Sequence, residues 1–335
     1  MGQTLSEPVT TKKTACCRND SYRVGSSSMQ GWRVSMEDSH VHILSLPDDP
    51  GTSFYGVYDG HGGAAVSHHV SKHLHEYITK RSEFKNGNIS LAMQKAFLEL
   101  DKDMQNESTL REKQAGSTAI TVLIKDNILY SANAGDSRAV ASVRGRAVAL
   151  SQDHKPTLAT EKKRIEAAGG WVEFGRVNRH LALSRAFGDF MFKQNNRKPQ
   201  EEQIVTVLPD VKEFEITEDW EFLILACDGI WDVMTNQDAV KFVRSRLACP
   251  KKNDEEEQFV DPEEICEDLL KHCLAPDVLM DIGCDNMTVV LVFFLHGKPY
   301  SHLVSKCQQV PVDSELLESI GDTSRISTGI FESSL

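Results

Sequence analysis

Four aspartates stand where runs of apolar residues begin or end, and their oxygens could hold a metal ion. They are Asp59, Asp136, Asp228 and Asp285. A single aspartate of this kind is ordinary turn chemistry at the end of a strand. Neighbouring strands bring their ends together, however, and several carboxylates at one point repel each other unless some are protonated or a cation lies between them. Oxygen ligands alone select Mg²⁺ or Mn²⁺ over zinc or copper, so the sequence predicts a site for one of these hard metals.

The segment 30–38 adds two more carboxylates and a cation, Glu37, Asp38 and Arg33. Apolar and polar residues alternate there, and in a β-strand Arg33 and Glu37 would project from the same face. An arginine beside acids is commonly part of a surface ion pair. Beside a metal cluster it can instead clamp a phosphate oxyanion with two N–H donors.

Hydrophobic patterns predict the elements that position these residues. We expect strands at 54–58, 117–124 and 128–133, another after Ser137 that runs through Val143, and strands at 222–227 and 287–295. Helical periodicity predicts helices at 64–78, 90–104, 160–168, 236–248 and 262–274. Strands in hairpin order with helices between them indicate an α+β fold around antiparallel sheets.

The composition excludes several classes of protein. The 335 residues include 37 Lys and Arg against 49 Asp and Glu, and the formal net charge of −12 argues against nucleic-acid binding. The longest apolar runs are far shorter than the ~20 residues of a membrane span, and no secretory signal is recognisable. Eight cysteines without a C-x-x-C pair indicate reduced thiols in a cytoplasmic or nuclear protein, and not a zinc site.

Residues 1–21 are expected to form a flexible N-terminal segment. The chain begins M-G-Q-T-L-S, the pattern for N-myristoylation of Gly2, which would give reversible membrane association. Cys16 and Cys17, next to basic residues, could add a second lipid or an electrostatic signal. At the other end, residues 298–335 are polar and Ser-rich, which predicts a tail or a short appended helix, and 250–262 reads as an acidic loop.

A series of segments together resembles, in sequence and in order, the metal-dependent protein phosphatase family, also called protein phosphatase 2C. The segments are 31–38 (GWRVSMED), 56–63 (GVYDGHGG), 115–119 (AGSTA), 133–138 (NAGDSR), 153–156 (DHKP), 183–189 (LSRAFGD), 226–232 (ACDGIWD) and 285–289 (DNMTV). One D-G-H-G-G alone would be weak evidence, but the whole series in this order is specific. It marks 22–297 as a phosphatase catalytic domain.

The resemblance implies a β-sandwich of two antiparallel sheets flanked by helices, with two metal ions at one edge. Asp59 is then expected to bridge both ions. Asp228 and Asp285 would complete one of them, and Glu37 with the carbonyl of Gly60 would bind the other.

The same resemblance implies further roles around the two ions. Asp38 would act through metal-bound water, and Asp136, with Asp228 and Asp232, would hold a third, weaker ion. Arg33 matches the phosphate-binding arginine of the family, and His61 matches its proposed general acid.

The implied reaction is hydrolysis of phosphoserine and phosphothreonine in protein partners by a metal-activated water. A histidine that protonates the departing alkoxide is worth roughly 10²–10⁴ in rate, and His61 directly follows the metal-binding turn. Two alternatives are an inactive pseudophosphatase that only binds, and a hydrolase of small phosphoesters. Arg33 and the carboxylates that match the family's ligands are all present, which favours an active enzyme. The protein is expected to be a monomer.

One segment departs from the family pattern. At 177–182 (VNRHLA), Arg179 stands where the family usually has glycine, and a non-glycine residue is expected to change the turn of a flap beside the cleft. We expect Arg179 or His180 to contact substrate residues near the phosphoamino acid.

Overall fold

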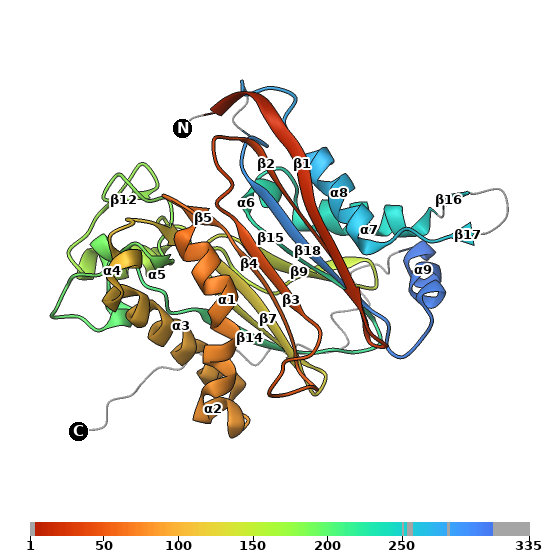
Figure 1. Cartoon of the computed structure of the whole chain (residues 1–335), viewed down its shortest axis with the longest axis horizontal. Coiled ribbons are helices and arrows are strands. Elements are labelled where there is room, and N and C mark those ends of the chain that lie inside the picture. Colours follow the sequence, from red (N-terminus) through yellow and green to blue (C-terminus); the bar gives the residue numbers. More distant parts are fainter. Residues whose placement is uncertain (1–3, 250, 253–256, 280–281, 311–335) are drawn as a thin grey trace.

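Two antiparallel sheets form the body of the computed structural model, which describes residues 4–249, 251–252, 257–279 and 282–310 (Figure 1). The first sheet orders its strands as β1 (Thr4–Arg18), β2 (Tyr22–Arg33), β18 (Met287–Phe294), β15 (Trp220–Ala226), β9 (Arg138–Val143) and β10 (Arg146–Ala149). The second orders them as β14 (Asp210–Glu215), β8 (Ile128–Ala134), β7 (Ala119–Lys125), β4 (Ser53–Tyr58) and β3 (Ser39–Ile43).

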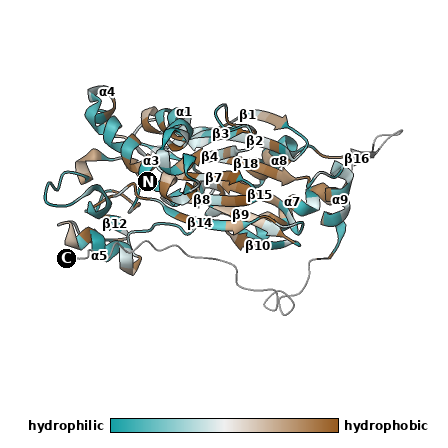
Figure 2. Ribbon diagram, turned by 90° about the horizontal axis from the view of Figure 1, so that it is seen from below, coloured by the Kyte–Doolittle hydropathy of each residue, from teal (hydrophilic) through white to brown (hydrophobic). Residues whose placement is uncertain are grey.

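The two sheets pack face to face over a shared apolar core. Val24, Leu223 and Val292 of the first sheet meet Val57 and Val122 of the second in one cluster, and all five are fully buried. Figure 2 shows these central strands as the most hydrophobic part of the molecule. Burial of both faces explains why β18 consists almost entirely of apolar residues, all of them buried.

Helices cover the outer face of each sheet. α1 (Ala65–Lys80) and α3 (Ile89–Asn106) pack on the five-stranded sheet, whereas α7 (Asn236–Ala248), α8 (Pro262–Cys273) and α9 (Tyr300–Gln308) pack on the six-stranded sheet (Figure 1). The shorter helices are α2 (Ser82–Lys85), α4 (Ser108–Arg111), α5 (Ala159–Ala167) and α6 (Asp228–Trp231), with 3-10 turns at Phe190–Phe192 and Gln200–Glu202. The predicted α+β sandwich flanked by helices is confirmed.

Short strands outside the two main sheets form further small sheets among the described residues. β5 (Gly60–His61), β6 (Gly116–Ser117) and β13 (Phe187–Gly188) form a three-stranded sheet, and β11 (Val172–Glu173) pairs with β12 (Arg176–Val177). β16 (Lys251–Lys252) pairs with β17 (Glu257–Gln258) within the predicted loop at 250–262. Among the described residues, the helices are all too short or too polar to cross a bilayer.

The prediction of a flexible segment at 1–21 is wrong for the residues that the structure describes. β1 pairs antiparallel with β2 from Thr4, opposite Arg33, to Arg18, opposite Arg23. Its side chains are mostly exposed, so its sequence looks like a polar tail. The backbone is held nevertheless, because β2 would otherwise present an unpaired edge.

Two segments at the boundaries of elements were predicted as a strand (34–38) and as a tail or a short appended helix (after 298). β2 ends at Arg33, so 34–38 is not a strand and Arg33 and Glu37 do not share a strand face. In the segment after 298, α9 packs its buried Leu303 and Val304 against the six-stranded sheet and its helices. Residues 1–3, which include Gly2, and 311–335 lie outside the described residues.

Candidate metal centre

The ends of both sheets meet at one edge and bring the predicted aspartates together. Asp59 follows β4 of the second sheet, and Asp228 follows β15 of the first sheet after Cys227. Asp285 precedes β18, the neighbour of β15, and Asp136 lies between β8 and β9. One ligand atom each from Asp38, Asp59 and Cys227 lies within 4.8 Å of the other two, which joins residues of both sheets at a single point.

Electrostatic coupling shows that the cluster is wider than these three residues. Burial raises the pKa of Asp59 far above its ordinary value, and the charges of Asp228, Asp38, Asp285 and Asp136 raise it further. Carboxylates in this arrangement cannot all be ionised without a compensating cation.

Burial and neighbouring carboxylates also raise the pKa values of Asp228 and Asp38. Burial raises the pKa of Asp228 well above its usual range, and the charges of Asp136, Asp285 and Asp232 add to the effect. Burial likewise raises the pKa of Asp38 to about 7, against a hydrogen bond from Thr288. The predicted aspartates therefore form one acidic cluster.

The donor set of the cluster fits a hard divalent ion. Asp38 accepts a hydrogen bond from Thr288 Oγ1 at 2.7 Å on Oδ2, but its buried Oδ1 has no hydrogen-bond partner among the described residues. A buried carboxylate oxygen without a donor is costly unless a cation or a bound water satisfies it. Cys227 is fully buried and its pKa is raised well above its ordinary value, first by burial. It therefore stays a neutral thiol, and the remaining side-chain ligands are oxygens.

Glu37 is held at the cluster by contacts on both of its carboxylate oxygens. Ser35 Oγ donates to Oε1 at 2.7 Å, and the Gly63 N–H donates to Oε2 at 3.0 Å. Gly60 lies directly against this segment, since a Cβ atom there would stand 2.3 Å from the Glu37 carbonyl oxygen. Only glycine permits this approach, which explains its place in the D-G-H-G-G turn.

Asn286 organises the segment 34–38 in place of the predicted strand. Its Nδ2 donates to the carbonyls of Gln30 and Ser35, at 2.8 and 2.9 Å, and its Oδ1 accepts from the Glu37 N–H at 2.9 Å. Asn286 belongs to the DNMTV motif at 285–289, but the sequence alone assigned it no role. Nothing in the local sequence shows that an asparagine beside Asp285 holds a segment some 250 residues away.

Two cations contact the cluster from its rim. Arg33 Nη2 donates to Asp285 Oδ2, and both side chains are partly exposed. Lys155 Nζ donates to Asp136 Oδ2. The position of Arg33 agrees with its predicted closeness to the metal site, whereas the contact of Lys155 was not predicted.

His61 is paired with a second residue that sequence reasoning missed. Its Nε2 lies 2.7 Å from Oδ2 of Asp189, whose side chain is 7% exposed. Burial lowers the pKa of His61, but the charge and hydrogen bond of Asp189 outweigh that effect and raise it above its ordinary value. A Cβ on Gly116 would lie within 2.4 Å of both partners, so this glycine makes room for the pair.

Arg179 and His180 lie in the turn that follows β12, between Val177 and Leu181, which pair with each other. Arg179 Nε and Nη2 each donate to a carboxylate oxygen of Glu173, at 2.6 Å, and the His180 N–H donates to the Val177 carbonyl. Among the described residues, no hydrogen bond or ion pair links them to the acidic cluster. Their role toward a substrate stays a prediction.

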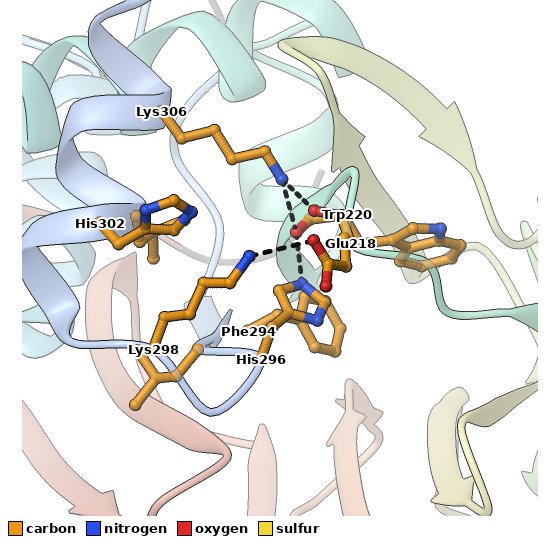
Figure 3. A pocket seen from close by; sticks show the side chains of 9 residues that line it. Glu218, Trp220, Phe294, His296, Lys298, His302 and Lys306 are labelled. Carbon is orange, nitrogen blue, oxygen red and sulfur yellow. Dashed lines mark hydrogen bonds and ion pairs between the residues drawn. The ribbon is translucent and has the colours of Figure 1, made fainter.

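A small pocket lies at the ends of β15 and β18 that are far from the acidic cluster, and it is too small to be a functional site (Figure 3). Its cavity of about 10 Å³ has room for a single water molecule at most. Its charged lining is already paired: Lys298 Nζ lies 3.0 Å from Glu218 Oε2, and His296 Nε2 lies 2.9 Å from the Trp220 carbonyl.

Comparison with known proteins agrees with this geometry. Residues 22–281 match the family model of protein phosphatase 2C. A probable protein phosphatase 2C of Caenorhabditis elegans is 55% identical over 331 residues, covering 98% of this chain and 90% of that protein. Protein phosphatase 2C homolog 2 of Schizosaccharomyces pombe is 46% identical over 304 residues, covering 89% of this chain and 80% of that protein.

Solved structures show the same architecture. The crystal structure of a phosphatase from Toxoplasma gondii superposes with a TM-score of 0.71 at 29% identity, covering 85% of this chain and 96% of the other. A second structure from that organism, a serine-threonine phosphatase 2C, gives a TM-score of 0.70 at 21% identity, covering 88% of this chain and 100% of the other, and supports the fold alone. The chain belongs to the protein phosphatase 2C family.

Proposed function

We propose that this chain is an Mg²⁺- or Mn²⁺-dependent phosphatase of phosphoserine and phosphothreonine in proteins, acting at the acidic cluster. Its family membership makes it a protein phosphatase. The observation that carries the metal dependence is the convergence of buried carboxylates from both sheets, with raised pKa values and an unsatisfied oxygen on Asp38.

We assign the residues of the cluster to two sets of ion ligands. Asp59 would contact both ions, Asp228 and Asp285 would complete one set, and Glu37 with the Gly60 carbonyl would complete the other. A weaker third position would be formed by Asp136 and Asp232 with Asp228. When bound, the ions lower the pKa of a water molecule and offset the charge that develops on the phosphoryl group.

The chain's other residues orient the substrate and move a proton. Arg33 can present its guanidinium to two phosphate oxygens once the substrate competes with Asp285. His61 can donate a proton to the departing serine or threonine oxygen from Nδ1, the ring nitrogen that is not bonded to Asp189, and Asp189 at Nε2 keeps the ring protonated until that transfer. Asp38 Oδ1 is free to accept a hydrogen bond from the attacking water.

An assay with two substrates and a chelator tests this proposal. We expect the metal-loaded chain to hydrolyse a phosphoserine protein and p-nitrophenyl phosphate, and to lose both activities in EDTA. Activity that survives EDTA would contradict the metal mechanism. Turnover of p-nitrophenyl phosphate alone would favour the small-phosphoester hydrolase, and no turnover of either would favour the pseudophosphatase.

The role of His61 can be separated from that of the metal site by the leaving group. His61→Ala should slow hydrolysis of an alkyl phosphate by roughly 10²–10⁴. It should slow hydrolysis of an aryl phosphate much less, because phenolates leave without a proton. Equal losses on both substrates would exclude His61 as the general acid.

We also infer that Gly2 is N-myristoylated and that the protein is a monomer of the cytoplasm, with a fraction on membranes and in the nucleus. The M-G-x-x-x-S start supports acylation, and reduced cysteines suit the compartment. Mass spectrometry of the mature N-terminus tests the acyl group, and light scattering tests the monomer.

A further inference from the structure

The N-terminal strand begins at the catalytic edge. Thr4, the first described residue, pairs with Arg33, and Arg33 contacts Asp285 of the acidic cluster. Only two residue steps separate Gly2 from Thr4, a reach of at most about 7 Å. An acyl group on Gly2 would therefore be attached close to the phosphate-binding arginine.

Exposed apolar side chains gather at the same edge. Val9, Val34, Val278, Leu279 and Ile282, here called the apolar rim, are 37%, 52%, 39%, 86% and 55% exposed. Together they make up most of the large apolar side chains that are exposed among the described residues; the others are Trp171, Phe174, Met191 and Val310. A concentration of this kind marks an interaction surface more often than chance exposure does.

Hydrogen bonds fix the rim to the catalytic edge. Val9 pairs with Gly31 two positions before Arg33. Trp32 Nε1 donates to the Ala275 carbonyl at 3.0 Å, and the Ala275 N–H donates to the Gly283 carbonyl at 2.9 Å, which holds both ends of the segment that carries Leu279 and Ile282. In Figure 1 this segment, after α8, lies beside the start of β1.

We propose that the apolar rim and an acyl chain on Gly2 dock together on a lipid bilayer, so that the catalytic edge faces the membrane surface. The inference rests on the lipidation proposed above. A single myristoyl chain binds membranes only weakly, with K on the order of 10⁴ M⁻¹, and a stable attachment takes a second signal. The rim supplies that signal as apolar area beside the acyl chain.

The cysteine pair predicted as a second signal is badly placed for this role. Cys16 pairs with Gly25, whereas Thr4 pairs with Arg33, eight positions away along β2, which corresponds to about 27 Å. Val9, the rim residue on β1, pairs with Gly31, six positions from Gly25, so the pairing of β1 with β2 keeps Cys16 about 20 Å from it.

The charge of the molecule indicates which lipids it would accept. The net charge of the chain is −12. An anionic surface would repel a molecule of this charge, so apolar burial and not electrostatic attraction must drive the contact. The substrates favoured by this orientation are phosphoproteins that are themselves held at a neutral bilayer surface.

Vesicle sedimentation of the full chain tests the proposal. The chain is produced with an N-myristoyltransferase, its acylation is confirmed by mass, and it is sedimented with phosphatidylcholine vesicles. We expect Leu279→Ser with Ile282→Ser to lower the partition coefficient at least about tenfold. Val310→Ser, which changes a side chain that is 87% exposed after α9, is the matched control and should bind like the unchanged chain.

Two results would overturn the membrane surface. One is equal binding of the acylated double variant and the unchanged chain. The other is binding that requires phosphatidylserine and disappears in high salt. Hydrolysis of a water-soluble phosphopeptide, measured on the same samples, should be unaffected by the rim variants. If the unchanged chain does not hydrolyse the phosphopeptide, the proposed phosphatase function is contradicted, but the vesicle result still tests the membrane surface.

Discussion

Asp59 is a residue whose charge opposes folding in the absence of metal. It is buried at the centre of the cluster, and the neighbouring carboxylates raise its pKa far above its ordinary value. A bound cation converts the same arrangement from repulsive to attractive. We therefore expect Asp59 to destabilise the metal-free fold, while its proposed role is to bind the ions.

Substitution of Asp59 by asparagine should separate these two effects. We expect Asp59→Asn to abolish phosphatase activity and to stabilise the metal-free protein by about 1–2 kcal/mol, the usual gain when a strained functional group is relieved. Thermal unfolding in EDTA measures the second effect. Asp48→Asn, at an exposed carboxylate, should change neither property. A lower Tm of metal-free Asp59→Asn would show that the cluster is not repulsive.

Asp189 should control the protonation of His61. Asp189→Asn removes the charge that raises the pKa of His61, while burial continues to lower that pKa. A general acid works only while protonated, so activity that falls at alkaline pH in the unchanged enzyme should fall at lower pH in the variant. The pH profile of kcat on a phosphoserine peptide measures this shift. A lower rate with an unmoved alkaline limb would assign Asp189 a merely structural role.

The clustering of the four aspartates Asp59, Asp136, Asp228 and Asp285 could be predicted from the sequence because each lies near the end of an apolar strand. Asp59 and Asp228 end such strands, and the family motifs supply their order. Asn286, Asp189 and Lys155 could not be assigned from local patterns. Their partners are far away in the chain, and the hydrogen bonds exist only once both sheets are packed.

Among the elements, the turn after β12 holds non-glycine residues in a left-handed conformation. Arg179 adopts φ = 67° and Asn178 φ = 49°, in the region that glycine adopts without strain. The expectation that Arg179 changes the turn relative to the family stays a prediction. A left-handed non-glycine residue costs on the order of 1 kcal/mol, and the exposed ion pair with Glu173 offsets at most part of it.

Arg179→Gly should therefore affect selectivity more than stability. We expect a change in Tm of no more than about 2 °C, with a several-fold loss of kcat/KM on phosphopeptides that carry acidic neighbours, compared with neutral ones. Glu173→Gln is the opposite control, because it frees the guanidinium and should favour acidic peptides. Unchanged relative rates across the panel would exclude Arg179 from substrate contact.

Helices were more predictable than the edges of the sheets. The predicted helices at 160–168 and 236–248 agree with α5 and α7 to within one residue. α7 buries the apolar positions Ala239, Val240, Val243 and Leu247 at helical spacing, whereas α5 buries only Glu161 and Ile165. β1 was missed since an edge strand with two exposed faces lacks a hydrophobic pattern. The strand predicted through 34–38 ends at Arg33, because side-chain hydrogen bonds from Asn286 replace ladder pairing there.

At the scale of the whole molecule, metal binding and folding are linked through protons. Asp38 has a folded pKa of about 7 without metal, above the ~3.9 of an unfolded aspartate. Its stabilising contribution is therefore fully present below the unfolded pKa and is lost as the pH rises through about 7. Ions bind the deprotonated carboxylates, so their binding should release protons and strengthen with pH.

The increase in Tm caused by Mn²⁺ should accordingly be larger at pH 8 than at pH 6. Paired melting curves in EDTA and in Mn²⁺ at each pH give this difference directly. The Asp59→Asn variant, which lacks the central ligand, should show little increase at either pH. An increase that is the same at both pH values would contradict proton-linked binding.

The placement of the two described ends has a practical consequence for engineering. β1 starts beside Arg33, whereas α9 packs near Trp220, at the far end of β15 from Asp228. A fluorescent reporter or affinity tag fused ahead of Thr4 would crowd the entrance for phosphoproteins and remove the free glycine needed for acylation. The same label inserted directly after α9 would lie at the far end of β15 from Asp228 and would leave Gly2 free, so live-cell imaging and pull-down studies should label the chain there.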